Sequence, residues 1–246
     1  MEFRLDGKVA VVTGANRGIG AATARELARV GASVVVAARG ADTLQQVAGE
    51  LGGQGLAVPT DVTRLEDLDR LVAAAVERFG GIDVLVNNAG TSPPAKQIYK
   101  VTPEEWQQTM DINVRAAWYL SKAAHPHLKQ RGGGAIVNIA STSGLHHDIG
   151  LGTYSISKAA VIMLTTVCAK EWARDRIRVN ALAPGVVRTE LAGPLIQYLE
   201  SHNEKPNLMN MIGEPEDIAR LVRYLATDEA RYVTGEVVRI DGGELL

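Results

Sequence analysis

The sequence is poor in the features that mark secreted, nucleic-acid-binding and membrane proteins. Its 246 residues include one cysteine, Cys168, so no internal disulfide can form and the chain fits a reducing compartment. The net charge of −2 gives no basic field that would attract nucleic acid. No uninterrupted apolar run approaches the ~18 residues of a membrane span, and we do not expect the N-terminal residues to act as a signal peptide. We expect a soluble, cytoplasmic protein without a nucleic-acid or membrane partner.

What the sequence does contain is a repeated alternation of short apolar runs with longer segments of helical spacing, such as residues 21–30 and 65–79. The short runs are apolar throughout, as expected where helices cover both faces of a parallel sheet. The alternation predicts right-handed βαβ units, and therefore an α/β chain with a single-domain Rossmann fold over residues 1–246. Its doubly wound, seven-stranded parallel sheet would comprise Val9–Thr13, Ser33–Ala37, Leu56–Pro59, Val84–Asn87, Ala135–Ile139, Arg178–Ala181 and Glu236–Ile240.

Local signals mark two helix starts and one interruption. Thr63 and Glu66 have the spacing of a capping box, and Pro103 suits the first turn of a long helix. The segment after Thr189, "ELAGPLIQYLESHNEKPNLMNMIG", breaks the strand–helix alternation. We expect residues around 189–213 to form a lid over a substrate site; a long loop that contains a helix is the alternative.

The stretch "VAVVTGANRGIGAAT" runs from a buried-type strand directly into a helix. Gly14, Gly18 and Gly20 lie where a sharp turn, a close phosphate approach and tight helix packing leave no room for a Cβ. The N-terminus of the helix then offers unpaired N–H groups to a pyrophosphate. Because this turn falls in the first βα unit, it predicts dinucleotide binding.

The end of the second strand favours NADP(H), with NAD(H) as the alternative. It carries Ala38 and Arg39, where an NAD site usually places an acidic residue to bind the ribose 2′-hydroxyl. A guanidinium can hold a 2′-phosphate, and Arg17, inside the glycine turn, is expected to reach the same phosphate. Asp61 fits a hydrogen bond to the adenine, a local role at the next helix start, or both.

The chain resembles the short-chain dehydrogenase/reductase family, in its compact branch of about 250 residues, over nearly its whole length. The resemblance rests on motifs that occur in order and at the spacings of the family: "TGANRGIG" (13–20), "NNAG" (87–90), Asn113, Ser141, "YSISK" (154–158), "PGVVRT" (184–189) and "YVTGEVVRIDGG" (232–243). Within the family, the pattern is closest to the 3-oxoacyl-carrier-protein reductases. A dinucleotide-dependent ketone reductase or alcohol dehydrogenase is therefore implied.

The resemblance implies a catalytic tetrad of Asn113, Ser141, Tyr154 and Lys158. Reduction of a carbonyl needs a proton on oxygen, and free tyrosine, with a pKa of about 10, is too weakly acidic to work reversibly near neutrality. Lys158 lies four residues after Tyr154, on the same helix face. We expect its ammonium to lower the pKa of the phenol, Ser141 to stabilise the substrate oxygen, and Asn113 to hold a water of a proton relay.

The resemblance also implies further cofactor contacts. Asn87 and Gly90 would close the fourth strand against the cofactor, and Val187 and Thr189 would meet the carboxamide of the nicotinamide. With the residues already named, the expected cofactor set is Gly14, Asn16, Arg17, Gly18, Ile19, Gly20, Arg39, Asp61, Val62, Asn88, Ala89, Gly90, Tyr154, Lys158, Pro184, Gly185, Val187 and Thr189.

The substrate is the least determined part. The expected contacts are Ser141, His147, Leu151 and Tyr154. Adjacent His146 and His147 should not point the same way in extended chain, and without a spaced third ligand we predict no metal site. An aromatic content of 4% argues against a large flat cavity lined with rings.

Several functions remain open. The leading one is NADP(H)-dependent reduction of a ketone; the others are an NAD-linked polyol or hydroxy-acid dehydrogenase, a 3-oxoacyl-carrier-protein reductase, and a cofactor-sensing protein without turnover. Basic docking residues for a carrier protein could be Lys129, Arg131, Arg174 and Arg176, although surface ion pairs explain them equally well. The family resemblance implies a homotetramer.

Overall fold

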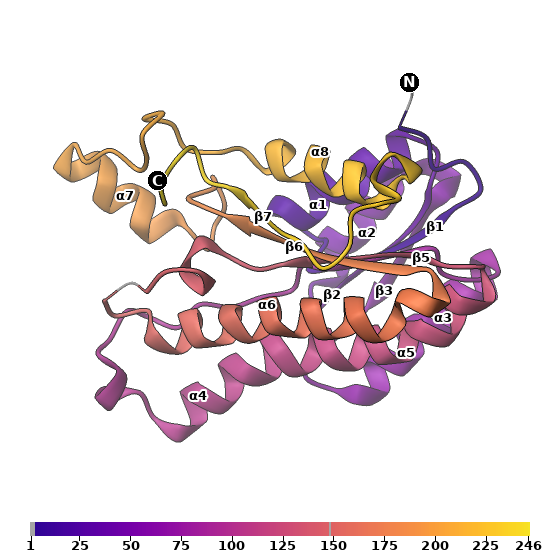
Figure 1. The fold of residues 1–246 in the computed structure, drawn as a ribbon, viewed down its shortest axis with the longest axis horizontal. Helices are drawn as coiled ribbons and strands as arrows, with labels where there is room; N and C mark the ends of the chain where they lie inside the picture. Colours follow the sequence, from indigo (N-terminus) through magenta and orange to yellow (C-terminus); the bar gives the residue numbers. More distant parts are fainter. Residues whose placement is uncertain (1–2, 148) are drawn as a thin grey trace.

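The computed structural model describes residues 3–147 and 149–246. Its seven described strands form one parallel sheet in the order β3-β2-β1-β4-β5-β6-β7 (Figure 1), which confirms the predicted fold class. The strands lie close to their expected positions. β6 is longer than the expected Arg178–Ala181, because it continues to Pro184. The strands are β1 (Val9–Thr13), β2 (Ser33–Ala38), β3 (Gly55–Pro59), β4 (Val84–Asn87), β5 (Gly134–Ile139), β6 (Ile177–Pro184) and β7 (Val237–Ile240).

Helices cover both faces of the sheet, which explains why its central strands are apolar on both sides. The described helices are α1 (Gly18–Arg29), α2 (Ala41–Glu50), α3 (Leu65–Phe79), α4 (Pro103–Met110), α5 (Ala116–Gln130), α6 (Gly152–Trp172), α7 (Gly193–His202) and α8 (Pro215–Ala226). One face packs on α1, α2 and α8, and the other on α3, α5 and α6 (Figure 1). Every residue of β1 is buried between these two layers.

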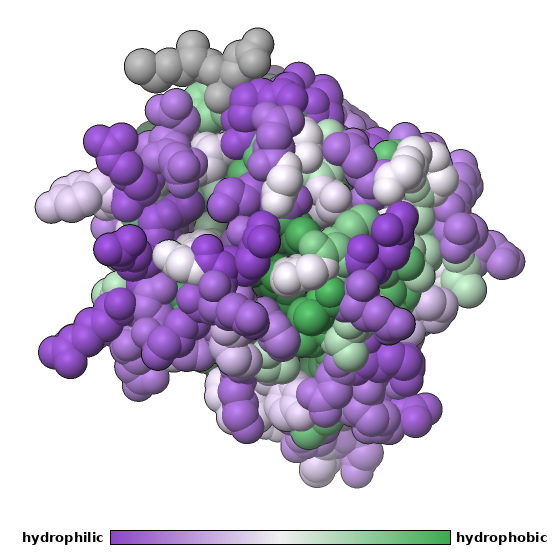
Figure 2. Space-filling model, turned by 90° about the vertical axis from the view of Figure 1, so that its right-hand side faces the viewer, coloured by the Kyte–Doolittle hydropathy of each residue, from purple (hydrophilic) through white to green (hydrophobic). Residues whose placement is uncertain are grey.

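All carboxyl ends of the strands meet at one edge of the sheet, on the left of Figure 1, near α7 and the C-terminus. The chain reverses its direction of travel across the sheet between β1 and β4, where ligands bind in open α/β sheets. Figure 2 shows the opposite edge of the molecule, which is mainly hydrophilic around a central hollow of hydrophobic side chains. We therefore expect the ligand site at the carboxyl edge.

Two predictions of helix starts had different outcomes. Pro103 does begin α4, where Thr102 and Glu105 form a capping box. The predicted capping box at Thr63 is wrong, because α3 begins two residues later and Arg64 is its N-cap. The Thr63 hydroxyl instead donates to Asp61 at 2.8 Å, since that carboxylate lies nearer than the helix end.

The long helix expected after Pro103 is divided by a π-helical turn, Asp111–Arg115, between α4 and α5. Such turns occur mainly at functional sites, because the inserted residue shifts the facing side chains. Here the turn contains Asn113, which is buried. The helix thus changes its register at the residue that the sequence marks as functional.

Residues 152–175, which include α6, are long and apolar enough by length and composition to cross a membrane. The expectation from the sequence concerned only uninterrupted apolar runs, whereas this helix qualifies by its mean hydropathy. The core helix of a globular protein qualifies in the same way, and α6 packs against β6 and buries Cys168. It is a core helix of this sheet.

Candidate active site

The glycine turn between β1 and α1 is held by the "NNAG" segment that follows β4. Gly14 and Gly18 adopt positive φ values of 62° and 53°, which favour glycine. The Asn88 side chain donates to the carbonyls of Thr13, at 2.8 Å, and Gly14, at 3.1 Å. A Cβ at Gly20 would overlap the Gly14 carbonyl. The two turns therefore form one rigid unit.

This unit fits the diphosphate of a dinucleotide. Arg17, the N-cap of α1, makes no side-chain capping bond, and the first turn contains no acidic residue, so the N–H groups of the helix start remain for an anion. The turn also faces the beginning of the segment after β6, since a Cβ at Gly18 would lie 3.3 Å from Thr189. Gly90 fits as well, since its Cβ would lie 3.4 Å from the Lys158 Nζ and crowd the space beside it.

The residues expected around the adenosine meet only in part. Arg39 is exposed at the end of β2, and its charge helps to lower the pKa of Asp61. The main cause of that shift is the hydrogen bond from the Thr63 N–H to the carboxylate, so Asp61 has the local role weighed from the sequence. Arg17 is ion-paired with Glu190, whose carboxylate is its countercharge here, and its contact with a 2′-phosphate stays a prediction.

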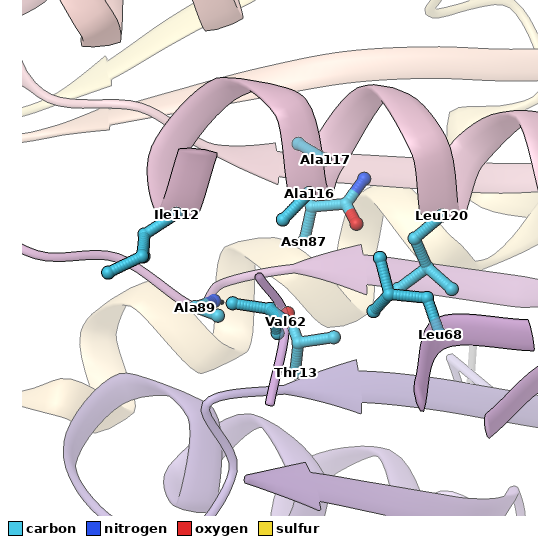
Figure 3. A pocket seen from close by; sticks show the side chains of 9 residues that line it. All are labelled: Thr13, Val62, Leu68, Asn87, Ala89, Ile112, Ala116, Ala117 and Leu120. Atoms are coloured by element: carbon cyan, nitrogen blue, oxygen red, sulfur yellow. Dashed lines mark hydrogen bonds between the residues drawn. The ribbon is translucent and has the colours of Figure 1, made fainter. Parts of the chain in front are cut away.

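The other residues expected on the nucleotide side are Asn16, Ile19, Val62 and Ala89. The Asn16 amide lies 3.4 Å from the Thr43 hydroxyl, against the turn after β2, while Ile19 packs on the core. Val62 and Ala89 border a cavity of about 10 Å³ (Figure 3), room for about one water molecule. This cavity is a packing gap beneath the site and not a substrate pocket.

Ser141, Tyr154 and Lys158 come together at the carboxyl ends of β5 and β6, as predicted. Tyr154 and Lys158 lie one turn apart on α6, with Nζ 5.7 Å from the ring centre. Lys158 is buried and donates to the Ile139 carbonyl at 2.8 Å. The Ser141 side chain interacts with the phenol, acting to lower its pKa, and the Ser141 hydroxyl accepts from the Ser143 N–H at 3.2 Å.

The pKa of the phenol corrects one expectation. Burial raises the pKa of Tyr154, and the hydrogen bond from Ser141 opposes that shift only in part. The lowering predicted from Lys158 is wrong for this structure, because burial is the largest influence on this pKa and the influence that opposes it comes from Ser141. Burial also lowers the pKa of Lys158, to about 8, so the ammonium is still the major form at neutral pH.

Asn113 joins the site through its side chain. Its Oδ1 accepts the Thr91 N–H at 2.8 Å, and its Nδ2 donates to the Thr91 carbonyl and the Ser157 hydroxyl, both at 2.9 Å. Ser157 lies one residue before Lys158. The Asn113 amide thus ties the π-helical turn to the lysine helix. Both Nδ2 hydrogens are engaged, so the predicted relay water would have to donate to an oxygen of Asn113.

Asn87 does not face a cofactor, contrary to the prediction. Its Nδ2 donates to the Ser121 hydroxyl at 2.9 Å and to Asn138 Oδ1 at 2.8 Å, both buried. A buried amide needs such partners, and they lie on α5 (Ser121) and on the neighbouring strand β5 (Asn138). Its neighbour Asn88 binds the glycine turn instead.

The segment after β6 begins with a short parallel bridge between Val187 and Gly213. Pro184 ends β6, and the Gly185 N–H donates to the Ile240 carbonyl at 3.1 Å. Val187 is buried, while the Thr189 hydroxyl donates to the Val187 carbonyl and accepts the Ala192 N–H, each at 3.3 Å. The segment lies opposite Gly18, and its contact with the nicotinamide carboxamide stays a prediction.

The expected substrate residues divide into two groups. Ser141 and Tyr154 lie together. Leu151, which is half-buried, is the N-cap of α6. His147 is exposed, and no contact joins it to the tetrad. The two histidine rings lie 4.8 Å apart, so the expectation that they diverge is wrong, because His146 belongs to a turn closed on the Thr142 carbonyl.

Sequence reasoning missed two residues of the site. Ser157, inside the "YSISK" stretch, links Asn113 to α6 and donates to the Tyr154 carbonyl at 2.7 Å. Glu244, after the terminal glycine pair, reaches Thr142 beside the catalytic serine. Ser157 could have been found from its place between Tyr154 and Lys158. Glu244 carries no local signal.

A larger cavity, of about 300 Å³, lies behind the segment after β6. Its walls come from that segment, α8 and the end of β7: Val186, Val187, Asn207, Met209, Met211, Gly213, Asp217, Ile218, Arg220, Ile240, Asp241 and Gly242. The tetrad does not line it. Within residues 3–147 and 149–246, no group of three or more His, Cys, Asp or Glu side chains could hold a metal ion.

Comparisons with known proteins agree with this geometry. The family model described as enoyl-(acyl carrier protein) reductase matches residues 14–244. Human dehydrogenase/reductase SDR family member 4 is 41% identical over 97% of this chain and 88% of its own length. A 7α-hydroxysteroid dehydrogenase complexed with NADH and 7-oxo glycochenodeoxycholic acid superposes with a TM-score of 0.93 at 34% identity, covering 99% of this chain and 96% of its own. A 3-ketoacyl-(acyl-carrier-protein) reductase from Brucella melitensis complexed with NADH gives 0.92 at 34% identity, over 98% and 99%.

Proposed function

The chain belongs to the short-chain dehydrogenase/reductase family, and from this premise we propose that it reduces a ketone to a secondary alcohol, reversibly, with NADP(H). One observation carries the proposal. The Ser141 side chain interacts with the Tyr154 phenol and acts to lower its pKa, and the Lys158 ammonium lies 5.7 Å from the centre of the ring. That combination supplies a proton donor and an anion-stabilising group at one point of the carboxyl edge.

The roles follow from the contacts. The nicotinamide, when bound, supplies the hydride to the carbonyl carbon. Tyr154 gives its phenolic proton to the carbonyl oxygen, and its raised pKa keeps that proton in place until it is needed. Ser141 donates to the same oxygen as negative charge grows there. Lys158 provides positive charge behind the phenol. Asn113 binds Ser157 and so holds the helix of Lys158, α6, against the π-helical turn.

The preference for NADP(H) rests on Arg39 and the absence of an acid at the end of β2. We propose that the 2′-phosphate is held by Arg39, with Arg17 joining it by exchanging Glu190 for the phosphate.

A second candidate is an NAD-linked polyol or hydroxy-acid dehydrogenase. Two observations favour it: the ion pair of Arg17 with Glu190, and the NADH bound in both solved relatives. Comparison of kcat/KM for NADPH and NADH with one substrate decides between the two cofactors. A cofactor-sensing protein without turnover fits less well, because the tetrad is complete.

The surroundings of the site extend the proposal. We propose that the segment 189–213 is a lid over the substrate, since it begins opposite the glycine turn and carries exposed Leu191, Leu195 and Tyr198. A carrier-protein substrate remains open, although Lys129 and Arg131 are bound to Asp175 and Asp83.

We propose a cytoplasmic homotetramer. The exposed apolar side chains of α5 and α6, among them Trp118 and Met163, support association of subunits through these helices. Light scattering on the purified protein measures the mass directly, and a monomer would contradict the proposal.

The function is tested by following NADPH oxidation by absorbance over a panel of ketones, with NADPH binding measured separately by fluorescence. We expect at least one ketone to be reduced, with product alcohol formed in equal amount. NADPH binding without reduction of any ketone in the panel would contradict the proposal and favour a binding protein.

A further inference from the structure

The chain ends in a tight turn after β7, residues 241–245, which we call the C-terminal hook. Asp241 closes it with both carboxylate oxygens, which accept the N–H groups of Gly243 at 3.0 Å and Leu245 at 3.2 Å. Gly242 and Gly243 have φ values of 61° and 86°, a backbone conformation that residues with a Cβ rarely adopt. The sequence Asp-Gly-Gly thus turns the chain sharply and places the next residue, Glu244, back over the sheet edge.

The Glu244 carboxylate lies between two turns of the active site. On one side, the Thr142 hydroxyl donates to Oε1 at 3.5 Å, a long contact, and Thr142 directly follows Ser141. On the other side, a Cβ at Gly185 would overlap Oε2, so glycine makes room for the carboxylate at the end of β6. One acidic group therefore contacts both the turn of the catalytic serine and the turn of the "PGVVRT" segment.

The outer side of the hook is held as well. The Met209 N–H donates to the Gly242 carbonyl at 3.1 Å, and a Cβ at Gly242 would lie 2.8 Å from the Asn207 side chain. A Cβ at Gly243 would lie 3.2 Å from Leu208. Because the end of the segment 189–213 packs on it, the hook cannot swing outward without a change at both places.

The serine needs such support because it sits in a short turn. Ser141 precedes the 3₁₀ turn Thr142–Gly144 and is tied to that turn by the Ser143 N–H. A rotation of the turn would move the Ser141 hydroxyl away from the Tyr154 oxygen. Thr142 is buried in this turn, so a bond to its hydroxyl restrains the rotation.

We propose that Glu244 is a positioning residue for the reaction, which acts through Thr142 to hold the Ser141 hydroxyl against Tyr154. The proposal rests on the proposed function for its kinetic part, because it assigns Ser141 to the substrate oxygen. Its structural part, that Glu244 restrains the turn 141–144, stands independently of any substrate.

The kinetic test compares Glu244→Ala, Glu244→Gln, Thr142→Val and the Thr142→Val/Glu244→Ala double variant. We expect Glu244→Ala to lower kcat about tenfold, because it removes one hydrogen bond to a charged group. KM and the NADPH Kd should stay within about twofold of their values in the unmodified protein. Glu244→Gln, which keeps an acceptor oxygen, should restore most of the rate. Thr142→Val should match Glu244→Ala, and the double variant should lose no more than either. The control is Glu229→Ala, an exposed acid of the same region of sequence.

The structural test needs no turnover. Hydrogen exchange of the amides in residues 141–145 should be faster in Glu244→Ala than in the unmodified protein, whereas exchange in the glycine turn 13–20 should not change. If exchange in 141–145 is unchanged, or if losses in the double variant add, the proposal is wrong. A raised KM with unchanged kcat would also overturn it, since that result would indicate direct contact with substrate. If no ketone is reduced at all, the exchange result still decides the structural part.

Discussion

The nucleotide side and the substrate side of the carboxyl edge are built in different ways. On the nucleotide side the main chain is tightly held. The Asn88 side chain binds the backbone carbonyls of the glycine turn, and a Cβ at Gly20 would collide with main chain. On the substrate side, long side chains are exposed, such as Leu195 and Tyr198 of α7. The proposed function thus places a fixed cofactor and catalytic apparatus beside an adaptable substrate wall.

The largest effect should come from the residue at the border of the two sides. Tyr154→Phe removes the proton donor and should lower kcat by about 10²- to 10⁴-fold, with NADPH affinity changed by less than about twofold. Steady-state kinetics and a fluorescence titration measure the two quantities. The matched control is Tyr232→Phe, an exposed tyrosine between α8 and β7. Retained turnover in Tyr154→Phe would show that the proton comes from elsewhere.

On the nucleotide side, a single charge should change cofactor choice. Arg39→Asp places a carboxylate where we expect the 2′-phosphate, and should lower kcat/KM for NADPH relative to NADH by about 10- to 100-fold, since the change replaces attraction by repulsion. The ratio is measured with one ketone and both cofactors. An unchanged ratio would refute the assignment of Arg39 to the phosphate and favour the NAD-linked alternative.

Two glycines test the rigidity of the nucleotide side directly. Gly20→Ala forces a Cβ against the Gly14 carbonyl, and should lower the free energy of unfolding by about 1–3 kcal/mol as well as weaken NADPH binding. Gly49→Ala, in α2 with nothing within 4 Å of its Cβ, should instead stabilise by up to about 1 kcal/mol. Thermal denaturation with and without NADPH compares them. Equal effects would mean that the turn is not tightly packed.

The smallest effect should come from the substrate side. Leu195→Ala truncates an exposed side chain and should alter stability by no more than about 0.5 kcal/mol, while KM shifts with the size of the ketone and kcat stays the same. Leu225→Ala, at a fully buried position of α8, should cost about 2–5 kcal/mol. If Leu195→Ala also destabilises by several kcal/mol, α7 belongs to the core and is not an adaptable wall.

The sequence was sufficient for the parts that depend on local spacing. Strand positions follow from apolar runs, and the meeting of Tyr154 with Lys158 follows from four residues of helix. The glycine turn was predicted because positive φ values and close approaches admit no other residue. These constraints act between residues close in sequence, so they can be predicted without knowledge of the fold.

The remainder depends on partners distant in sequence. Arg17 pairs with Glu190, 173 residues away, and Glu244 reaches Thr142 across 102 residues. Asn87 was misassigned because its partner amide, Asn138, lies 51 residues away on the next strand. The sign of the Tyr154 pKa shift depends on burial, which only the packed structure sets. Such features are properties of the assembled edge and not of any one motif.

The central claim is that the buried Lys158 ammonium supports proton donation by the Tyr154 phenol. The pH dependence of kcat/KM for ketone reduction tests this claim most directly. The pKa of Lys158 lies at about 8, below its usual 10.5, so the charged form persists below that pH and is lost above it. The phenol, with a raised pKa, stays protonated over the same range. We predict a plateau below pH 8 and a tenfold fall per pH unit above it. A profile that stays flat to pH 10 would contradict the account.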